Sequence, residues 1–217
     1  MTSTAISAQG TIVQIATGTG GSKTATAIAV GNPTILTSAA HGFNNGDSIT
    51  FNSGFTGADA ALLNGVTATV TNKTTNTFAI QIDTTGKTIA AGTGAATPAT
   101  YTAVANVRSI SDLESGSASE IDVTNLASTA KEFRLGLADN GSFSLTIDHS
   151  NADAGQAALQ ARRLDGALVN MKVILPSGAT PTASFSALVK KFSKSAAVDG
   201  VVSASVDVRV SGTITWS

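Results

Sequence analysis

The sequence predicts a mostly β, α+β fold, an antiparallel β-sandwich or barrel with one packed helix at about 153–165 and an inserted small all-β domain. Three observations point to this fold. Many short segments alternate apolar and polar residues with the period of two that half-buried strands show. Turn dipeptides such as Asn64-Gly65 separate these segments. One window, Asp153–Asp165, has helical spacing instead.

The longest alternating segments lie in the second half of the chain. In Ser142–Asp148 and Val201–Val210, polar or charged residues alternate with apolar ones. We expect the apolar side chains to face the core and the polar ones to face water or another subunit. Met171–Leu175 and Thr182–Phe192 are predicted to be further strands, joined by the turn Pro176-Ser177-Gly178.

The predicted helix has recognisable signals at both ends. Asp153 can accept the N–H of Gln156, and the Gln156 side chain can reach back, as in a capping box. Gly166 supplies the C-terminal stop. The apolar stripe expected to face inward consists of Ala157, Ala161, Leu164 and Leu168.

Most of the first half of the chain is predicted to be a small domain inserted into a larger one. We place the larger domain at 1–22 and 99–217, beginning with a strand at Thr11–Ala16, and the inserted small β domain at 23–98. The flanks Thr17–Thr24 and Gly86–Thr100 are rich in small residues and are expected to be flexible linkers. The apolar set expected to form the core of the insertion comprises Ile35, Leu36, Ile49, Phe51, Leu62, Leu63, Val66, Val70, Phe78, Ile80 and Ile82.

Composition excludes several functional classes. Charged residues make up 12% of the chain and the formal net charge is −1, unlike the basic surface of a nucleic-acid binder. Cysteine is absent, which removes disulfides, thiolate zinc sites and cysteine nucleophiles. His41 and His149, the two histidines, have no second ligand nearby in sequence and are expected to be structural or surface residues. We expect no secretory signal and no membrane-spanning segment.

Candidate catalytic motifs are incomplete. Gly18–Thr24 lacks the Gly that a phosphate loop places directly before its Lys. Ser128–Lys131 matches S-x-x-K, but the K-T-G strand that accompanies it in acyl-enzymes is missing. The acidic stretch Asp112–Asp122 lacks the ligand spacing of a calcium-binding loop. The lysines of 190–194 lack a series of interleaved aromatic residues that could stack on nucleic-acid bases. We therefore expect no enzyme activity, no cofactor and no metal.

An ordered series of segments runs between Tyr101 and Gly212, after the strand at Gly10–Ala16. The segments are Val104–Ser111, Glu120–Leu126 with I-D-V-T-x-L, Lys131–Leu145 with E-F-x-x-G-L, Gly155–Leu159, Ser184–Phe192 and Val210–Gly212. In this order they resemble the tail tube proteins of phages with long, non-contractile tails. The resemblance implies a virion structural protein, assembled in the host bacterial cytoplasm into stacked hexameric rings. It implies contacts with tape-measure, tail-terminator and distal-tail proteins, duplex DNA passing without specific binding, and no membrane partner.

The insertion resembles a second family. Ala40–Phe43, Gly46–Phe51, Leu63–Gly65 and Thr75–Ile80 are similar to the small β-module that forms the first catalytic-cysteine half-domain of ubiquitin-activating enzymes. The similarity implies a fold without activity, because the insertion has neither a cysteine nor a nucleotide site.

Two sets of assembly residues follow from these patterns. The polar faces of the two long alternating segments are expected to line the lumen, through Ser142, Ser144, Thr146, Asp148, Ser203, Ser205 and Asp207. The segment Ser111–Asn140 is expected to be a long loop, mobile in the monomer and ordered by the neighbouring ring. Its expected inter-ring ion-pair residues are Asp122, Lys131, Glu132, Arg134 and Asp139. The alternative is a two-domain β binding module of a phage baseplate or a cell surface.

Overall fold

The computed structural model describes residues 5, 7–176 and 182–217. The predicted fold class is confirmed: the protein is mostly β, with antiparallel strand pairs and one α-helix. The turn predicted at Pro176-Ser177-Gly178 runs into the part outside the described residues. The elements in chain order are β1 (Ile12–Thr19), β2 (Lys23–Thr24), β3 (Ala27–Ala29), β4 (Thr34–Thr37), β5 (Ser48–Phe51), η1 (Ala60–Leu62), β6 (Thr67–Thr71), β7 (Thr77–Ile80), β8 (Ala95–Ala103), β9 (Val107–Ser111), β10 (Ser117–Asp122), β11 (Phe133–Asp139), β12 (Ser142–Asp148), α1 (Ala154–Asp165), β13 (Val169–Ile174), β14 (Thr182–Ser195) and β15 (Ser203–Trp216).

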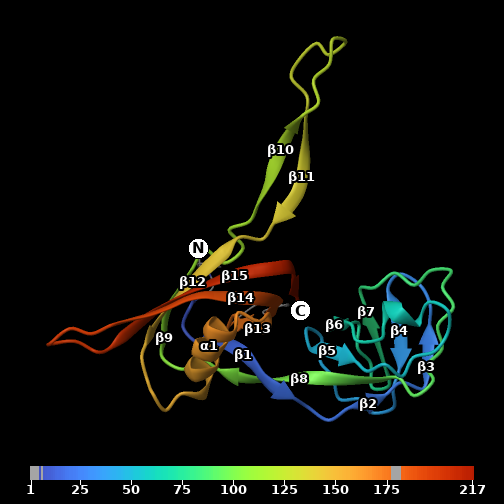
Figure 1. Cartoon of the computed structure of the whole chain (residues 1–217), viewed down its shortest axis with the longest axis horizontal. Coiled ribbons are helices and arrows are strands. Elements are labelled where there is room, and N and C mark those ends of the chain that lie inside the picture. Colours follow the sequence, from blue (N-terminus) through green and yellow to red (C-terminus); the bar gives the residue numbers. More distant parts are fainter. Residues whose placement is uncertain (1–4, 6, 177–181) are drawn as a thin grey trace. The chain divides into compact units, whose positions relative to one another are not determined.

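The chain forms two compact units. The first comprises the described residues of Met1–Ala103, Asn170–Ser184 and Thr215–Ser217. The second comprises Val104–Val169 and Phe185–Ile214. The first unit therefore contains the predicted insertion together with β1 and most of β13, and the second contains β9 to β12, α1 and most of β14 and β15 (Figure 1).

The inserted part of the first unit, β2 to β7, has its own aromatic and aliphatic core. Phe51 packs edge-on against Phe55, with ring centroids 5.3 Å apart, and Leu36, Leu63 and Ile80 are fully buried around them. Such aromatic pairs stabilise a core beyond the area that they bury. Two members of the predicted core set were wrong: Ile35 and Leu62 are exposed, because they lie on the outer faces of β4 and η1.

A buried histidine joins this core. The Nδ1 atom of His41 accepts a hydrogen bond from the backbone N–H of Phe43 at 3.0 Å, and Nε2 lies 3.2 Å from the carbonyl oxygen of Thr77. The ring also packs against Phe43 and Phe78. His41 is therefore a structural residue, as the sequence indicated.

Strand β8 connects the insertion to the rest of the first unit, and here the expectation of flexible linkers was wrong. The Ala96–Pro98 part of β8 pairs with β5, and its Ala99–Ala103 part pairs with β1. Residues as small as Ala and Thr become ordered because both neighbours supply backbone hydrogen bonds, and the Thr17 and Thr102 hydroxyls bond to one another at 2.8 Å. The change of partner falls between Pro98 and Ala99.

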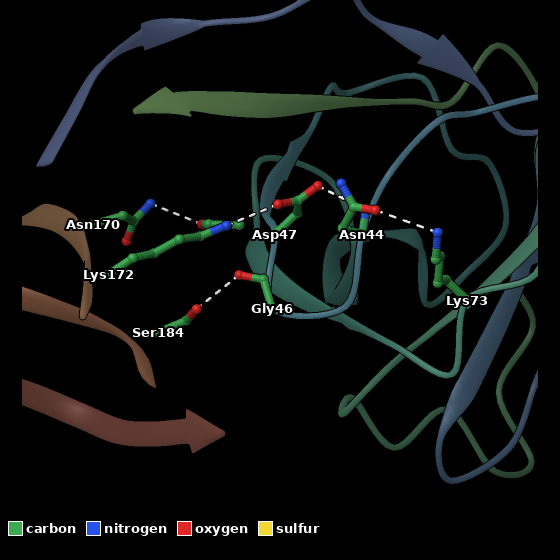
Figure 2. Close-up of polar contacts among 8 residues, drawn as sticks. Asn44, Gly46, Asp47, Lys73, Asn170, Lys172 and Ser184 are labelled. Carbon is green, nitrogen blue, oxygen red and sulfur yellow. Dashed lines mark hydrogen bonds and ion pairs between the residues drawn. The ribbon is translucent and has the colours of Figure 1, made fainter. Parts of the chain in front are cut away.

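A polar junction anchors the Asn44–Ser48 turn of the insertion to β13 and β14 (Figure 2). The Lys172 ammonium donates to the Asp47 carboxylate at 2.8 Å, and both side chains are largely buried. The Asn170 amide donates to the Ser48 hydroxyl at 2.8 Å, and the Ser184 hydroxyl donates to the carbonyl oxygen of Gly46 at 2.9 Å.

The same junction needs glycine at position 46 and holds an aromatic ring. Gly46 has φ +83°, and a Cβ there would collide with the hydroxyl of Ser217 and make a tight contact with that of Ser184. The Lys172 ammonium also lies 4.4 Å from the centre of the Tyr101 ring. Burial, together with the negative charge of Asp47, raises the pKa of Tyr101 to about 12. These contacts fix the insertion against β13 through desolvated groups.

The second unit is built on the order β14-β15-β12-β9. Phe143, Leu145 and Ile147 of β12 face the core, opposite Val206 and the other buried residues of β15. Phe143 meets Phe185 of β14 edge-on, with ring centroids 5.5 Å apart. The predicted division of both strands into an apolar and a polar face is confirmed by this burial.

Helix α1 is capped as predicted, but it buries a different face. Asp153 accepts from the backbone N–H of Gln156 at 2.7 Å, and Gly166 adopts a left-handed conformation at the C-terminus. The Gln156 side chain does not return to Asp153. It donates to the carbonyl oxygens of Ala105 and Asp148 and accepts from the N–H of Ser150. Because Gln156 satisfies three backbone groups, its face of the helix turns inward with Gly155 and Leu159. The predicted inward stripe was therefore wrong: its four members, Ala157, Ala161, Leu164 and Leu168, are exposed.

Candidate assembly surfaces

The first candidate surface is the polar face of β12 and β15. Their register pairs Ser144 with Asp207, Thr146 with Ser205, and Asp148 with Ser203. Directly paired residues share one face of a sheet, so the structure brings all seven predicted lumen residues together in one ladder. The seventh member, Ser142, pairs with Arg209 at the end of the ladder.

Charges on this polar ladder are compensated within the second unit. Asp148 forms an ion pair with Arg108 of β9, whose Nε atom lies 2.7 Å from its carboxylate, while Asp207 lies 4.0 Å from Lys191 of β14 and accepts a hydrogen bond from the Ser144 hydroxyl. Arg209 pairs with Asp139. A surface of hydroxyls with paired charges offers duplex DNA few uncompensated cations to bind its phosphates.

The second candidate surface is a hairpin formed by β10 and β11. The segment Ser111–Asn140 was expected to be a loop, but β10 and β11 form a two-stranded sheet of their own. Figure 1 shows this ribbon extending away from β12 and β15, the strands next to it in the second unit. A two-stranded ribbon without a covering layer is marginal in water by itself. The loop prediction failed because the segment combines alternating residues with many polar ones and glycines.

The hairpin exposes large apolar side chains. Phe133 is 52% exposed, Leu135 73% and Leu137 95%. The register places Asp122 opposite Phe133 and Glu120 opposite Leu135, so two carboxylates flank two of these apolar residues on one face. At the next position a bulge sets Gly136 and Leu137 against Ser119. Phe133, Leu135 and Leu137 were not among the site residues predicted from the sequence, although their spacing of two was a visible signal.

The predicted inter-ring residues are all on this hairpin and exposed, but two of them have local partners. Asp122 accepts from Thr124, which lowers the pKa of Asp122. The Gly141 backbone N–H, and then Arg209, lower the pKa of Asp139. Asp139 is thus already paired within its own chain. Lys131, Glu132 and Arg134 lie exposed around the tip and on β11.

Within the described ranges, no group of three or more His, Cys, Asp or Glu residues is arranged to hold a metal ion. No helix in that part of the chain is long and apolar enough to cross a membrane.

Comparison with known proteins identifies the class of protein that this fold represents. Residues 89–217 match the family model described as "Lambda phage tail tube protein, TTP", which is more than half of the chain. The chain belongs to this family, and it is a structural protein of the virion tail. None of the curated proteins compared with it matches.

Chains of several solved phage-tail and related particles are similar to this chain at low sequence identity. A chain of the virion of a native gene transfer agent particle is 20% identical, with 54% of this chain and 88% of that chain covered and a TM-score of 0.45. A chain of the SPP1 tail tube is 14% identical, with 54% and 69% covered and a TM-score of 0.43. A chain of the anti-feeding prophage baseplate is 12% identical, with 54% and 84% covered and a TM-score of 0.41.

Proposed function

We propose that this protein polymerises as stacked hexameric rings into a phage tail tube, the conduit for DNA ejection, and has no enzyme activity. The observation that carries the proposal is the polar β12–β15 ladder within a chain of the tail tube family. In the proposed tube, the seven ladder residues line the lumen, and their paired charges let DNA slide without specific binding. Assembly takes place in the host bacterial cytoplasm, with tape-measure, tail-terminator and distal-tail proteins as partners.

The test of the ladder uses accessibility in the assembled tube. Electron microscopy of the purified protein should show rings or tubes. A fluorescent label at Ser205→Cys should be shielded from a large soluble quencher in tubes, while a label at Gln81→Cys, an exposed module position, should stay accessible. The natural absence of cysteine makes each label unique. Equal quenching at both positions in tubes would overturn the lumen assignment.

The hairpin is proposed as the contact between rings. Phe133, Leu135 and Leu137 of the hairpin are exposed, and covering such apolar side chains with a neighbouring subunit is energetically favourable. The ion pairs proposed for Lys131, Glu132 and Arg134 add specificity, because exposed pairs contribute only about 0–1 kcal/mol each. Deleting Ala118–Ala130 should leave a folded monomer that cannot form tubes. Normal tubes from this deletion would rule out the hairpin as a stacking element.

The inserted module is proposed to lie on the outer wall. A duplex is about 20 Å across, judged from its groove dimensions, and a module with its own core would obstruct a lumen that must pass it. Residues 23–98 can be replaced by a short Gly/Ser linker while Ala99–Ala103 keep their pairing with β1. Lys172→Thr should accompany this deletion, because Lys172 otherwise loses its ion-pair partner Asp47. The tube should keep its inner diameter and become thinner outside. Failure to form rings would place the module in the assembly interface.

The alternative function, a binding module of a baseplate or cell surface, has less support. Carbohydrate-binding surfaces present exposed aromatic rings, and six of the eight phenylalanines are buried in the two cores. Phe133 is the exposed one, and it lies on the hairpin. Tube formation by the purified protein decides between the two functions.

A further inference from the structure

The segment that leaves the β10–β11 hairpin is bonded to a neighbouring strand at every residue. This exit segment, residues 139–141, connects β11 to β12, and each of its three residues contacts β15. The contacts are the Asp139–Arg209 ion pair, a hydrogen bond from the Asn140 amide to the Gly212 carbonyl oxygen, and one from the Val210 N–H to the Gly141 carbonyl oxygen. The hairpin is therefore not attached through a free linker.

Asp139 is the central residue of this arrangement, because its two carboxylate oxygens bind different partners. Oδ1 accepts from the Gly141 N–H at 2.9 Å, and Oδ2 accepts from Arg209 at 2.5 Å. Both contacts favour the ionised carboxylate, and together they lower the pKa of Asp139. Hydrogen bonds to a charged group are stronger than those between neutral groups. One side chain thus holds the exit turn and strand β15 together.

The segment that enters the hairpin is fixed as well. The Ser115 hydroxyl donates to the carbonyl oxygen of Ser142, the first residue of β12, at 2.9 Å. Two glycines let the entry and exit segments lie close together. A Cβ at Gly116 would lie 2.3 Å from the carbonyl oxygen of Asp139, and one at Gly141, which has φ +73°, would lie 2.6 Å from the Ser115 hydroxyl. Entry and exit segments therefore form one joint with the sheet.

The joint is strong only as a set of contacts. The side chains of Arg209 and Asp139 are 42% and 49% exposed, and an exposed ion pair contributes little by itself. The hydrogen bonds of Ser115, Asn140 and Gly141 act on the same two short segments. Tilting the hairpin relative to β12 and β15 would strain these contacts together, whereas a linker without them would leave the direction of the hairpin undefined.

We infer that this joint holds the β10–β11 hairpin in one direction before a second copy binds, and that Arg209 is the positioning residue. The inference rests on the proposed function, in which the hairpin is the contact between rings. The sequence led us to expect a segment that the neighbouring ring orders, and the joint supports the opposite sequence of events. A hairpin that is already directed loses less conformational entropy on binding. Arg209 belongs to β15, so it acts on stacking through Asp139.

Distances measured in the free chain by pulsed electron paramagnetic resonance test the joint. Spin labels at Leu126→Cys, near the hairpin tip, and at Ala161→Cys, on α1, occupy exposed positions in a chain without other cysteines. We expect a narrow distance distribution in the parent chain, and one about twice as broad with Arg209→Gln, because the loosened ribbon samples more directions. Arg108→Gln is the matched control and should leave the distribution narrow, since Arg108 pairs with Asp148 at the other end of β12.

The rate of tube formation by unlabelled chains tests the consequence for stacking. Arg209→Gln should form tubes about tenfold more slowly, because a smaller fraction of hairpins points in the binding direction. Arg209→Lys keeps the cation and should recover most of this rate together with the narrow distribution. Arg108→Gln should assemble at the parent rate. If Arg209→Gln folds poorly, Asn140→Ala loosens the joint without removing a charge and should change both measurements in the same direction.

The outcomes that overturn the inference are distinct. A broad distribution in the parent chain, or a narrow one in both Arg209→Gln and Asn140→Ala, would reject the joint. A broadened distribution with a normal rate of tube formation would reject Arg209 as a positioning residue for stacking. Absence of tubes from the unmodified chain would reject the proposed function itself, while the distances in the free chain would still decide whether the joint holds the hairpin.

Discussion

The inserted module and the β10–β11 hairpin are both polar-looking segments, but they differ in what they bury. The module encloses Phe51, Phe55, Phe78 and their neighbours in a core of its own, and it leaves only isolated apolar residues exposed. The hairpin encloses nothing and exposes Phe133, Leu135 and Leu137. The difference separates a region that is complete within one chain from a region whose apolar side chains, in our proposal, are covered by another chain. Substitutions in the module should therefore change folding, and substitutions in the hairpin should change assembly.

The largest effect on the free energy of unfolding is expected for Phe78→Ala in the module. Phe78 is 1% exposed and packs edge-on against Phe43, so its removal leaves a cavity as well as lost contact. We expect a loss of about 3–5 kcal/mol, measured by urea denaturation. The matched variant Leu135→Ala, at an exposed hairpin position, should change stability by less than about 0.5 kcal/mol. Similar losses from both would mean that the hairpin is packed in the free chain.

The junction should give the next largest effect. Asp47→Asn leaves the Lys172 ammonium without its anion in a largely desolvated place. We expect a loss of about 1.5–3 kcal/mol, the range for hydrogen bonds to charged groups. Lys87→Gln, which breaks the exposed pair with Asp59, is the matched control and should have little effect. If both variants behave alike, the junction is more hydrated than its burial indicates.

The same junction should weaken in alkali. The pKa of Tyr101 is raised from its usual value of 10 to about 12 in the folded chain, so folding favours the neutral phenol. Its contribution is complete below pH 10 and is lost as the pH rises through 12, because the unfolded chain ionises first. Two pKa units correspond to about 2–3 kcal/mol. Tyr101→Phe should remove this part of the pH dependence, as chemical denaturation between pH 9 and 12 would show. An unchanged slope in that variant would assign the loss to other groups.

The smallest effect on folding, with the largest on assembly, is expected for Leu137→Ser. Leu137 is 95% exposed, so the thermal unfolding of the monomer should stay unchanged. The yield of sedimentable tubes should fall sharply, because the apolar area that a second copy covers is reduced. Gln160→Ser, at an exposed position of α1 outside the stripe, should leave both quantities unchanged. Normal tubes from Leu137→Ser would remove this residue from the interface.

Local sequence patterns predicted the regular strands well. In β12 and β15 the alternation of Ser or Asp with Phe, Leu, Ile and Val continues over a whole strand, so a single register satisfies it. The ends of α1 were also predictable, because Asp153 and Gly166 act on groups within a few residues of themselves. The core of the module followed from its aromatic residues, apart from Ile35 and Leu62.

Longer-range polar contacts decided what the sequence could not. The face that α1 buries depends on Gln156, whose side-chain amide donates hydrogen bonds to the carbonyl oxygens of Ala105 and Asp148. Ala105 is distant from Gln156 in the sequence, so no local pattern shows this contact. A helical wheel weighs apolarity alone and so selected the stripe of Leu164 instead. The strand character of Ala95–Thr100, the end of the segment predicted to be a linker, likewise depends on β1 and β5, which pair with β8.

By itself the sequence determined the fold class, the two faces of the long strands, the helix caps and the resemblance to tail tube proteins, because these depend on period, on local hydrogen bonds and on the order of segments. Only the tertiary structure decided that Ser111–Asn140 forms a hairpin, that Asp47 meets Lys172, and that α1 turns its leucines outward. Those features arise from pairings between residues distant in sequence, and the free energy of such pairings depends on neighbours that no local pattern records.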